Sequence, residues 1–259
     1  MKVLNGKELA GFVKERQAGL VRSLKKKPKL LIIRDSDNPV IVKYVELKKK
    51  YGEDIGVEVE DYLAADENAV REKILAANKD ADICGIIVQL PLVDNNNLDE
   101  VLGLIAPEKD VDGLSGKGRF DSATATAINW LLAGYDIDLT GKKIALVGRG
   151  RLVGKPLYMM WTNSGFDVTV FHRGSNLDEL RDFDVVVTAT GVPHLIKNEM
   201  IRPGTVVVDA GTASEGGVLV GDIEESIRER EDLAAITPKI GGVGPLTVGV
   251  LFENVIVAR

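Results

Sequence analysis

Short apolar runs alternate with amphipathic patterns in the N-terminal part of the chain. Three runs are typical of buried strands: LLIIR at 30–34, VEVEDYL at 57–63 and ICGIIVQL at 83–90. A helix is predicted after each run, the first through Lys48, the second over ENAVREKILAANKD and the third over DNNNLDEVLGLI. Buried strands separated by helices of this length predict right-handed βαβ crossovers and a parallel sheet covered on both faces.

The alternation is interrupted at 106–122 by APEKDVDGLSGKGRFDS, a loop rich in glycine and charged residues. A helix over ATAINWLLAGY follows, and PLTVGVLFENVIVA at the end predicts a strongly apolar helix despite its β-branched residues. Between these two helices a second series of strands is predicted: KKIALVG (142–148), DVTVFH (167–172), DVVVTAT (184–190), TVVVDA (205–210) and AAITP (234–238).

This organisation predicts two α/β domains with a cleft between them. We expect an N-terminal three-layer α/β domain over 1–121 and a C-terminal Rossmann-type nucleotide-binding domain over 122–244. The last helix, 245–259, is too apolar for a free tail. We therefore expect it to pack back on the first domain.

The composition is that of a soluble globular protein, with 45% hydrophobic and 28% charged residues among 259. A net charge of −6 argues against a nucleic-acid or membrane-surface partner, which would require a basic face. No apolar segment approaches the roughly 18 to 20 residues needed to cross a bilayer. Cys84 is the only cysteine, which excludes an internal disulfide and favours the cytoplasm. Its apolar surroundings predict a small buried thiol rather than a nucleophile.

A glycine motif lies where a predicted strand gives way to a helix. In ALVGRGRLVGKPL, Gly148, Gly150 and Gly154 are spaced one residue more widely than in the usual dinucleotide fingerprint. Glycines let the backbone approach a pyrophosphate, and the N-terminus of the helix offers unpaired N–H groups and a positive dipole end. The strand–turn–helix context favours a dinucleotide site over an ordinary turn.

The end of the next strand bears on which dinucleotide is bound. An NAD site usually places an acid there for the ribose 2′-hydroxyl. This strand ends in FHRGS, with His172 and Arg173 and no acid. A guanidinium can pair with a 2′-phosphate, and Arg149 in the glycine turn adds a second positive charge. NADP is therefore favoured over NAD, the alternative being that Arg173 is a solvated loop residue.

Several polar residues fall at strand or helix ends in the first predicted domain. Gln89 ends the third strand, and Asp110 and Asp112 lie in PEKDVDGL. Gln89 is well placed for a ligand, because open α/β sheets bind ligands at the carboxyl ends of their strands. Alone, Gln89 could equally cap a strand and Asp112 could form an Asx turn. Tyr44 and Lys48 are one helical turn apart, a spacing common on exposed helices.

The motifs together resemble those of the bifunctional methylenetetrahydrofolate dehydrogenase/methenyltetrahydrofolate cyclohydrolase family. The matching stretches are YVELK, GIIVQLPL, PEKDVDG, VGRGRLVGKP, RPGTVVVDAG, LVGDI and GGVGPLT, in family order across nearly the whole chain. The resemblance implies oxidation of 5,10-methylene-tetrahydrofolate with NADP, followed by hydrolysis of the methenyl product to 10-formyl-tetrahydrofolate. It implies a homodimer and no metal, and His172 and His194 fit no metal-ligand spacing.

The resemblance also implies roles for particular residues. Lys48 is the residue that handles protons in the hydrolysis, which requires that its amine is sometimes neutral. Tyr44 faces the pterin, Gln89 orients Lys48, and Asp112 accepts hydrogen bonds from the pterin N–H groups. The other implied folate-binding residues are Val88, Leu90, Pro91, Gly241, Gly242, Val243, Gly244 and Pro245. The implied cofactor-binding residues are Thr124, Gly148, Arg149, Gly150, Val153, Gly154, His172, Arg173, Thr190, Gly191 and Thr212.

Two departures from the family pattern bear on activity. The family usually carries a PCTP element before the inter-domain helix, whereas this chain reads SATATA at 122–127 and retains only Thr124 of it. Family members often have a serine where this chain has Ile41. The alternatives are therefore a dehydrogenase that has lost the hydrolytic step, a folate- or nucleotide-binding relative without catalysis, and a different two-domain Rossmann dehydrogenase such as one for shikimate.

Overall fold

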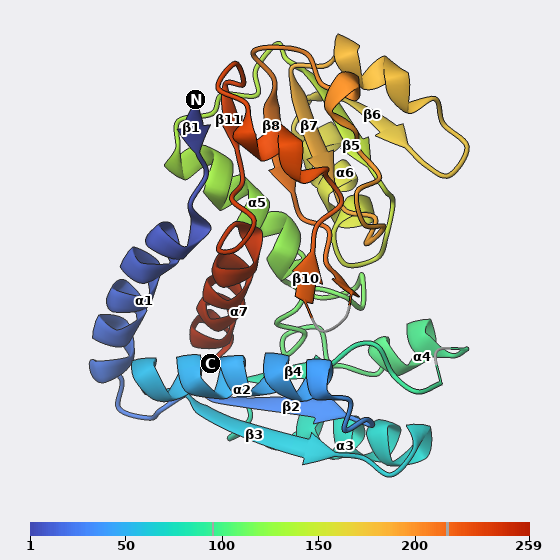
Figure 1. The fold of residues 1–259 in the computed structure, drawn as a ribbon. Helices are drawn as coiled ribbons and strands as arrows, with labels where there is room; N and C mark the ends of the chain where they lie inside the picture. Colours follow the sequence, from blue (N-terminus) through green and yellow to red (C-terminus); the bar gives the residue numbers. More distant parts are fainter. Residues whose placement is uncertain (95, 216–217) are drawn as a thin grey trace. The chain divides into compact units, whose positions relative to one another are not determined.

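A computed structural model describes residues 1–94, 96–215 and 218–259 (Figure 1). The chain divides into two compact units by its internal contacts. The six-stranded unit comprises Met1–Ala10 and Thr124–Thr247, and the three-stranded unit comprises Gly11–Ala123 and Val248–Arg259. The first ten residues therefore group with the C-terminal sheet, whereas the sequence placed them in the N-terminal domain. The reason is that β1 (Lys2–Val3) pairs in parallel with β11 (Ala235–Ile236).

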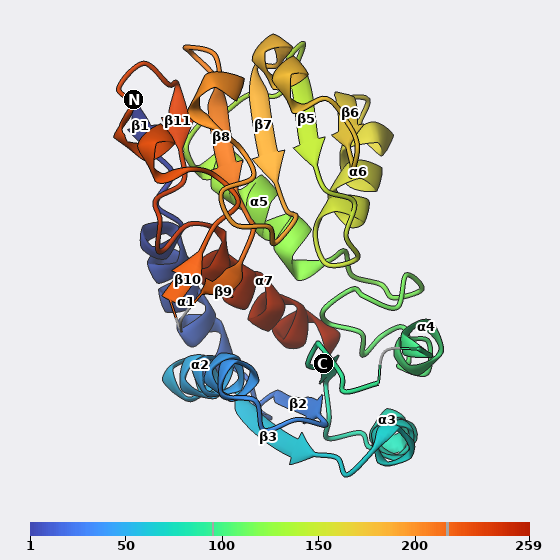
Figure 2. The same cartoon turned by 45° about the vertical axis from the view of Figure 1, so that its right-hand side comes forward.

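The three-stranded unit is built on the parallel sheet that the apolar runs predict. Its strands are β2 (Lys29–Arg34), β3 (Glu58–Leu63) and β4 (Gly85–Val88), in the order β3-β2-β4. The crossover from β2 to β3 runs in the opposite direction to the one from β3 to β4. Right-handed crossovers in opposite directions place their helices on opposite faces. Helices α2 (Pro39–Ile55) and α3 (Glu67–Lys79) lie on opposite sides of the sheet in Figure 2.

Local signals set the ends of α2 and α3. The Asn38 side chain accepts a hydrogen bond from the backbone N–H of Val40, and Pro39 occupies the first turn of α2. Gly56 ends α2 with a left-handed φ of 85°, a conformation that costs glycine little. The carboxylate of Asp66 caps α3 by accepting from Ala69 N–H. Lys48 thereby lies within α2, past its middle.

The helix predicted over DNNNLDEVLGLI is wrong in length. Helix α4 covers only Leu98–Leu102. Asn95, which the prediction included, lies outside the described residues. Asp94 instead accepts a hydrogen bond from the N–H of Asn96, an Asx-turn contact that competes with helix formation.

The second half of α7 (Val243–Ala258) completes the three-stranded unit, as expected for an apolar terminal helix. Gln17 donates to the carbonyl of Gly249 at 2.8 Å, from within α1 (Gly6–Arg22), a helix not predicted from the sequence. The rings of Tyr51 and Phe252 stack with centroids 5.0 Å apart. Asn254 donates to the carbonyl of Val111.

The six-stranded unit is a parallel sheet in the order β1-β11-β8-β7-β5-β6 (Figure 2). The five strands of the second predicted series are present, each shorter than predicted by one to three residues. The Val and Ile residues of these strands are buried, as expected for a parallel sheet, except in the edge strand β6, where Val168 and Val170 are partly exposed. The strands are β5 (Lys143–Val147), β6 (Asp167–Phe171), β7 (Val185–Thr188), β8 (Val206–Asp209) and β11.

The strand order reverses direction once in this sheet. From β5 the chain passes through α6 (Gly154–Asn163) to β6 on one side, then returns past β5 to β7 on the other. The carboxyl ends of β5 and β7 therefore flank a topological switch point, where open α/β sheets bind ligands. The remaining elements of the unit are α5 (Ala123–Gly134), η1 (Leu177–Asp182), η2 (Asn198–Met200), β9 (Ala213–Glu215), β10 (Val218–Val220) and η3 (Glu225–Glu229).

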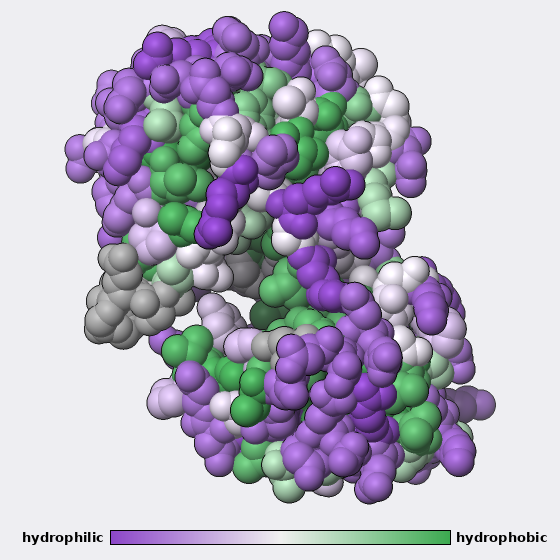
Figure 3. All heavy atoms as spheres, turned by 90° about the vertical axis from the view of Figure 1, so that its right-hand side faces the viewer, coloured by the Kyte–Doolittle hydropathy of each residue, from purple (hydrophilic) through white to green (hydrophobic). Residues whose placement is uncertain are grey.

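The surface carries few large apolar patches on the face drawn in Figure 3, where hydrophilic side chains cover most of it. Hydrophobic residues that are exposed, such as Phe12, Val93 and Ile240, are scattered along the chain. Among the described residues, no helix combines the length and apolar character that a membrane crossing needs.

Candidate functional site

A lysine–glutamine–aspartate group gathers in the three-stranded unit. The amine of Lys48, on α2, donates a hydrogen bond to Oε1 of Gln89 at 2.6 Å. Gln89 directly follows β4, and its own N–H donates to the carbonyl of Ile33, which fixes its backbone to the sheet. The Gln89 amide nitrogen donates to the carbonyl of Leu90, so the oxygen faces Lys48. In this orientation the amide oxygen accepts a hydrogen bond from the amine of Lys48.

Burial and a neighbouring acid act in opposite directions on Lys48. Removal from water disfavours the charged amine and lowers the pKa of Lys48 below its usual range, and the charge of Asp112 raises it less. Burial also raises the pKa of Asp112 to about 6, with Lys48 opposing and Asp110 adding to the rise. The pair thus combines an amine that loses its proton readily with a carboxylate that gains one readily.

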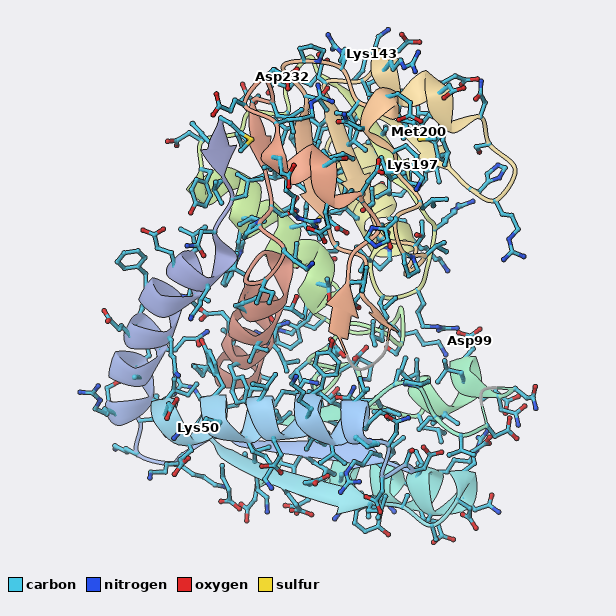
Figure 4. The ribbon with its side chains drawn as sticks, viewed as in Figure 1. Lys50, Asp99, Lys143, Lys197, Met200 and Asp232 are labelled. Atoms are coloured by element: carbon cyan, nitrogen blue, oxygen red, sulfur yellow. The ribbon has the colours of Figure 1, made fainter. Side chains whose placement is uncertain are left out.

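The next two lysines of α2 differ from Lys48. Lys49 forms an ion pair with Glu46 at 2.8 Å, and Lys50 with Asp54 at 2.9 Å. Hydrogen bonds to these carboxylates raise the pKa of both lysines. Figure 4 labels Lys50 on the same helix. The two lysines are therefore charged residues on the surface of the helix.

Other predicted folate-binding residues lie on α2 near Lys48 or next to Gln89 in the sequence. Tyr44 is partly buried and precedes Lys48 by one turn of α2, while Ile41 is buried in the core. Val88 is buried at the end of β4, and the Leu90–Pro91 peptide bond that follows Gln89 is cis.

Asp110 shapes the loop that carries Asp112. It is 1% exposed, and its carboxylate accepts hydrogen bonds from the N–H groups of Gly113, Leu114 and Ser115 and from the Ser115 hydroxyl. A Cβ at Gly118 would lie 2.8 Å from the same carboxylate. The sequence predicted no role for Asp110, although this residue lies in the loop rich in glycine and charged residues at 106–122.

The glycine motif of the six-stranded unit forms a tight turn from β5 to α6. Gly148 has a φ of 101°, and a Cβ there would lie 2.7 Å from the carbonyl oxygen of Ala189. A Cβ at Gly154 would lie 2.2 Å from the carbonyl oxygen of Gly148, so the first turn of α6 presses on the end of β5. A Cβ at Gly150 meets no atom within 4 Å. The turn therefore presents backbone and the N-terminus of α6 at the switch point, with Val153 as the N-cap residue.

Two arginines lie on exposed positions beside this turn. Arg173 and His172 directly follow β6, where a Ser175–His172 turn forms through the hydrogen bond of Ser175 N–H to the His172 carbonyl. The guanidinium of Arg149 lies over the ring of Tyr158, 5.4 Å from its centroid. Neither the turn Gly148–Gly154 nor the segment FHRGS at 171–175 contains an acid.

The loops after β7 and β8 come together at the same edge. A Cβ at Gly148 would lie 3.1 Å from the methyl group of Thr190, and a Cβ at Gly191 would lie 3.5 Å from the carbonyl of Thr212. The structure thus brings Gly148, Thr190, Gly191 and Thr212 into one region of the unit. Thr124 lies separately in the first turn of α5.

The segment from Gly241 to Pro245 leads into α7 within the same unit. The carbonyl of Gly241 accepts a hydrogen bond from Lys7 N–H, and Gly241 has a φ of 88°. A Cβ at Gly6 would lie 1.9 Å from the carbonyl oxygen of Gly242. Helix α7 begins at Val243, two residues earlier than predicted.

The prediction of a buried Cys84 is wrong. Cys84 is partly exposed, because β4 begins only at Gly85 and the preceding residues Asp80–Asp82 form a turn at the surface. Over the part of the chain that the structure describes, no three His, Cys, Asp or Glu side chains are grouped in a way that could hold a metal ion.

Family models match both parts of the chain. Residues 4–112 match the catalytic domain of tetrahydrofolate dehydrogenase/cyclohydrolase, and residues 122–259 match its NAD(P)-binding domain. A bifunctional protein FolD of Lactobacillus delbrueckii subsp. bulgaricus is 40% identical over 272 residues, which cover 98% of this chain and 96% of the relative.

Solved structures of the same kind are similar over the whole chain. A bifunctional FolD methylenetetrahydrofolate dehydrogenase/cyclohydrolase from Campylobacter jejuni matches with a TM-score of 0.93 and 33% identity, covering 100% of this chain and 98% of that one. A Trypanosoma brucei methylenetetrahydrofolate dehydrogenase-cyclohydrolase, complexed with NADP cofactor and inhibitor, matches with a TM-score of 0.90 and 30% identity, covering 99% and 96%.

Proposed function

Because the chain belongs to the tetrahydrofolate dehydrogenase/cyclohydrolase family, we propose that it catalyses both reactions of that name. It oxidises 5,10-methylene-tetrahydrofolate to the 5,10-methenyl form with NADP and hydrolyses that product to 10-formyl-tetrahydrofolate. The observation that carries the proposal is the Lys48–Gln89 hydrogen bond beside Asp112, because a mere binding protein has little use for a buried lysine of lowered pKa.

The oxidation needs positioning more than a proton acceptor. The methylene carbon lies between two nitrogens whose lone pairs stabilise the cation left when hydride departs. NADP supplies the hydride acceptor when it is bound. The side chains of the three-stranded unit therefore have one task in this step, which is to hold the pterin; the negative charge of Asp112 suits the pterin N–H groups, and the ring of Tyr44 suits its face.

The hydrolysis needs a group that takes a proton from water. A neutral Lys48 amine can accept one water proton as the water oxygen bonds to the cationic methenyl carbon. The resulting ammonium can return that proton to the nitrogen whose bond to the carbon breaks, and the remaining hydroxyl proton is released to solvent as the formyl C=O forms. The bond to Gln89 Oε1 uses one amine hydrogen and directs the lone pair elsewhere. Burial lowers the pKa of Lys48 and so enlarges the neutral fraction of its amine, whereas hydrogen bonds to Asp54 and Glu53 raise the pKa of the exposed Lys50.

The six-stranded unit fits NADP at its switch point. Gly148 and Gly154 leave no room for side chains where backbone must approach a pyrophosphate, and α6 points its N-terminus to the same place. Arg173 and Arg149 are available to a 2′-phosphate, and an acid that would repel it is absent from the turn Gly148–Gly154 and from FHRGS.

A second candidate is a dehydrogenase with weak hydrolysis. Ile41, where family members often carry serine, is 5% exposed and belongs to the core, so it offers water no hydrogen bond near Lys48. SATATA at 122–127 replaces the usual PCTP element at the start of α5. Ile41 favours a lower hydrolysis rate, SATATA bears on how the nicotinamide is placed, and both leave the family assignment intact.

We also infer that the chain works as a homodimer in the cytoplasm. The family resemblance supports the dimer, and the single free thiol of Cys84 is in keeping with a reducing compartment. Light scattering over a range of concentrations tests the dimer, and a constant monomer mass contradicts it.

Two spectrophotometric assays test the proposed function. Methenyl formation from methylene-tetrahydrofolate is measured with NADP and, separately, with NAD, and decay of added methenyl-tetrahydrofolate is measured without nucleotide. We expect both activities and a preference for NADP. Methenyl formation without hydrolysis supports the second candidate, and absence of both activities refutes the proposal.

A further inference from the structure

We infer that Asp222 is a positioning residue for the cofactor: together with Asp209 it holds the backbone of the loop 189–192 in place at the switch point. This inference rests on the proposed function, since the loop matters only if a dinucleotide binds beside it. Asp209 lies in the matching stretch RPGTVVVDAG and Asp222 in LVGDI, and the sequence predicted no role for either acid.

The loop that Asp222 holds is in contact with the glycine turn. It follows β7, and both the Ala189 carbonyl and the Thr190 methyl group pack against Gly148. Gly148 is the residue through which the backbone of β5 enters the predicted pyrophosphate site. A displacement of 189–192 therefore changes the shape of the site even though Asp222 does not reach it.

Asp222 is bonded directly to this loop. It is completely buried, and its Oδ2 accepts a hydrogen bond from the N–H of Thr190 at 2.6 Å. The Thr190 hydroxyl in turn accepts from Val192 N–H at 3.1 Å. Burial raises the pKa of Asp222, partly offset by the Thr190 N–H bond, while the nearby Asp209 raises it further. The backbone of the loop is thus fixed from behind by one carboxyl group.

Asp209 supports Asp222 and the neighbouring loop after β8. Its Oδ1 accepts hydrogen bonds from the N–H groups of Gly211 and Asp222, both at 3.1 Å, and from the Thr188 hydroxyl. Its Oδ2 is paired with Arg228 at 2.7 Å, so its charge is balanced within the unit. One buried acid therefore ties the end of β7, the start of the loop after β8 and the backbone of the second acid.

Two glycines leave space for these carboxylates. A Cβ at Gly211 would lie 2.0 Å from Oδ1 of Asp222, and a Cβ at Gly221 would lie 1.9 Å from Oδ2 of Asp209. The two contacts are reciprocal. Asp222 packs on Gly211, which lies two residues after Asp209, and Asp209 packs on Gly221, which directly precedes Asp222. In the described residues Oδ1 of Asp222 has no hydrogen-bond partner. The carboxyl group faces the loop backbone through the Thr190 N–H, and the Gly191 N–H also lowers the pKa of Asp222.

The test compares Asp222→Ala with Asp222→Asn in the full chain. Asparagine keeps an acceptor for Thr190 N–H, whereas alanine removes it and leaves a buried donor unpaired. We expect the Kd for NADP, measured by calorimetric titration, to rise at least about 10-fold in Asp222→Ala and to change less than about 3-fold in Asp222→Asn, the loss of one buried hydrogen bond being of that size. Asp232→Ala, an exposed acid of the same unit that is labelled in Figure 4, is the matched control.

Hydrolysis of methenyl-tetrahydrofolate without nucleotide distinguishes positioning from general damage. It depends on Lys48 in the other unit, so a positioning role leaves its kcat and KM unchanged in Asp222→Ala. Parallel loss of hydrolysis and NADP affinity, or unaltered NADP affinity in Asp222→Ala, overturns the inference.

A measurement on the unaltered chain covers the case in which Asp222→Ala does not fold. The amide of Thr190 is expected to exchange with deuterium slowly, like the amides of β7; fast exchange overturns the inference. If the chain binds NADP but catalyses neither reaction, the proposed function is refuted. The inference about Asp222 is not refuted by that result, because its test measures the affinity for NADP. A chain that does not bind NADP refutes both.

Discussion

The Lys48 region and the carboxyl edge of the six-stranded sheet place their charged groups in opposite ways. Lys48 and Asp112 keep charges partly buried with few partners, and the pKa of each is shifted toward its neutral form. At the sheet edge, Asp209 is held by an arginine and several N–H groups behind the loops, and backbone forms the surface. The first arrangement suits proton transfer, and the second suits a binding surface whose backbone is held in one shape.

This difference indicates which substitutions should affect one of the two proposed reactions and not the other. Side chains near Lys48 change chemistry without changing the nucleotide site, because they belong to the other unit. Residues at the sheet edge change nucleotide affinity without altering the amine of Lys48.

Replacing Lys48 by methionine is expected to have the largest effect. Methionine keeps the length and apolar stem of lysine but cannot accept a proton, so methenyl hydrolysis should fall by about 100- to 10,000-fold, the usual contribution of a general base. Methylene oxidation with NADP should be retained within about 10-fold. Steady-state assays of both reactions check this. Lys50→Met is the control, since Lys50 is an exposed ion-pair partner of Asp54. Hydrolysis that persists in Lys48→Met contradicts the role given to the amine.

Replacing Arg173 by serine is expected to lower NADP affinity by about 10- to 100-fold and to leave NAD affinity unchanged. The reason is the loss of a charge-assisted contact with the 2′-phosphate, which NAD lacks. Calorimetric titration with both nucleotides measures the change. Equal weakening of both, or of neither, identifies Arg173 as an ordinary solvated loop residue.

Replacing Asp112 by asparagine is expected to change the pH dependence of stability. The folded-state pKa of Asp112 is about 6 against an ordinary 3.8, so the folded state holds this proton more tightly. Its contribution is present below about pH 4 and is lost as pH rises through about 6. Asp112→Asn should therefore gain stability relative to the parent as pH rises from about 4 to 7, by about 1 to 3 kcal/mol. Urea unfolding at both pH values measures it; a pH-independent difference contradicts the shift.

The same variant should also move the pH profile of hydrolysis. The charge of Asp112 raises the pKa of Lys48, so its removal lowers that pKa. The rising limb of the profile should shift to lower pH, even though the rate falls where Asp112 binds the pterin. A shift to higher pH is the contrary result.

The sequence predicted the fold well where apolar runs dominate. Both parallel sheets were recognisable because strands such as VVVD at 206–209 are buried on both faces and read as continuous apolar runs. Prediction failed where the determining contacts are distant in sequence. Nothing local to Lys2–Val3 indicates a strand, because β1 exists only through its pairing with β11.

The candidate site was predicted unevenly for a related reason. Lys48, Gln89 and Asp112 were named because motifs marked them, and the structure brings them together within one unit. Asp209, Asp222 and Asp110 were given no role, because their importance comes from backbone groups that only the folded loops direct at them. The exposure of Cys84 was missed since its strand begins two residues later than the apolar run suggests.

The protonation of Lys48 in the free protein tests the central claim most directly. In the chain labelled with ¹³C at the lysine ε-carbons, NMR titration can follow Lys48, assigned with Lys48→Met, beside Lys50 of the same helix. We expect the pKa of Lys48 to lie below the ordinary 10.5 and that of Lys50 to lie above it. Titration of Lys48 together with Lys50 would contradict it.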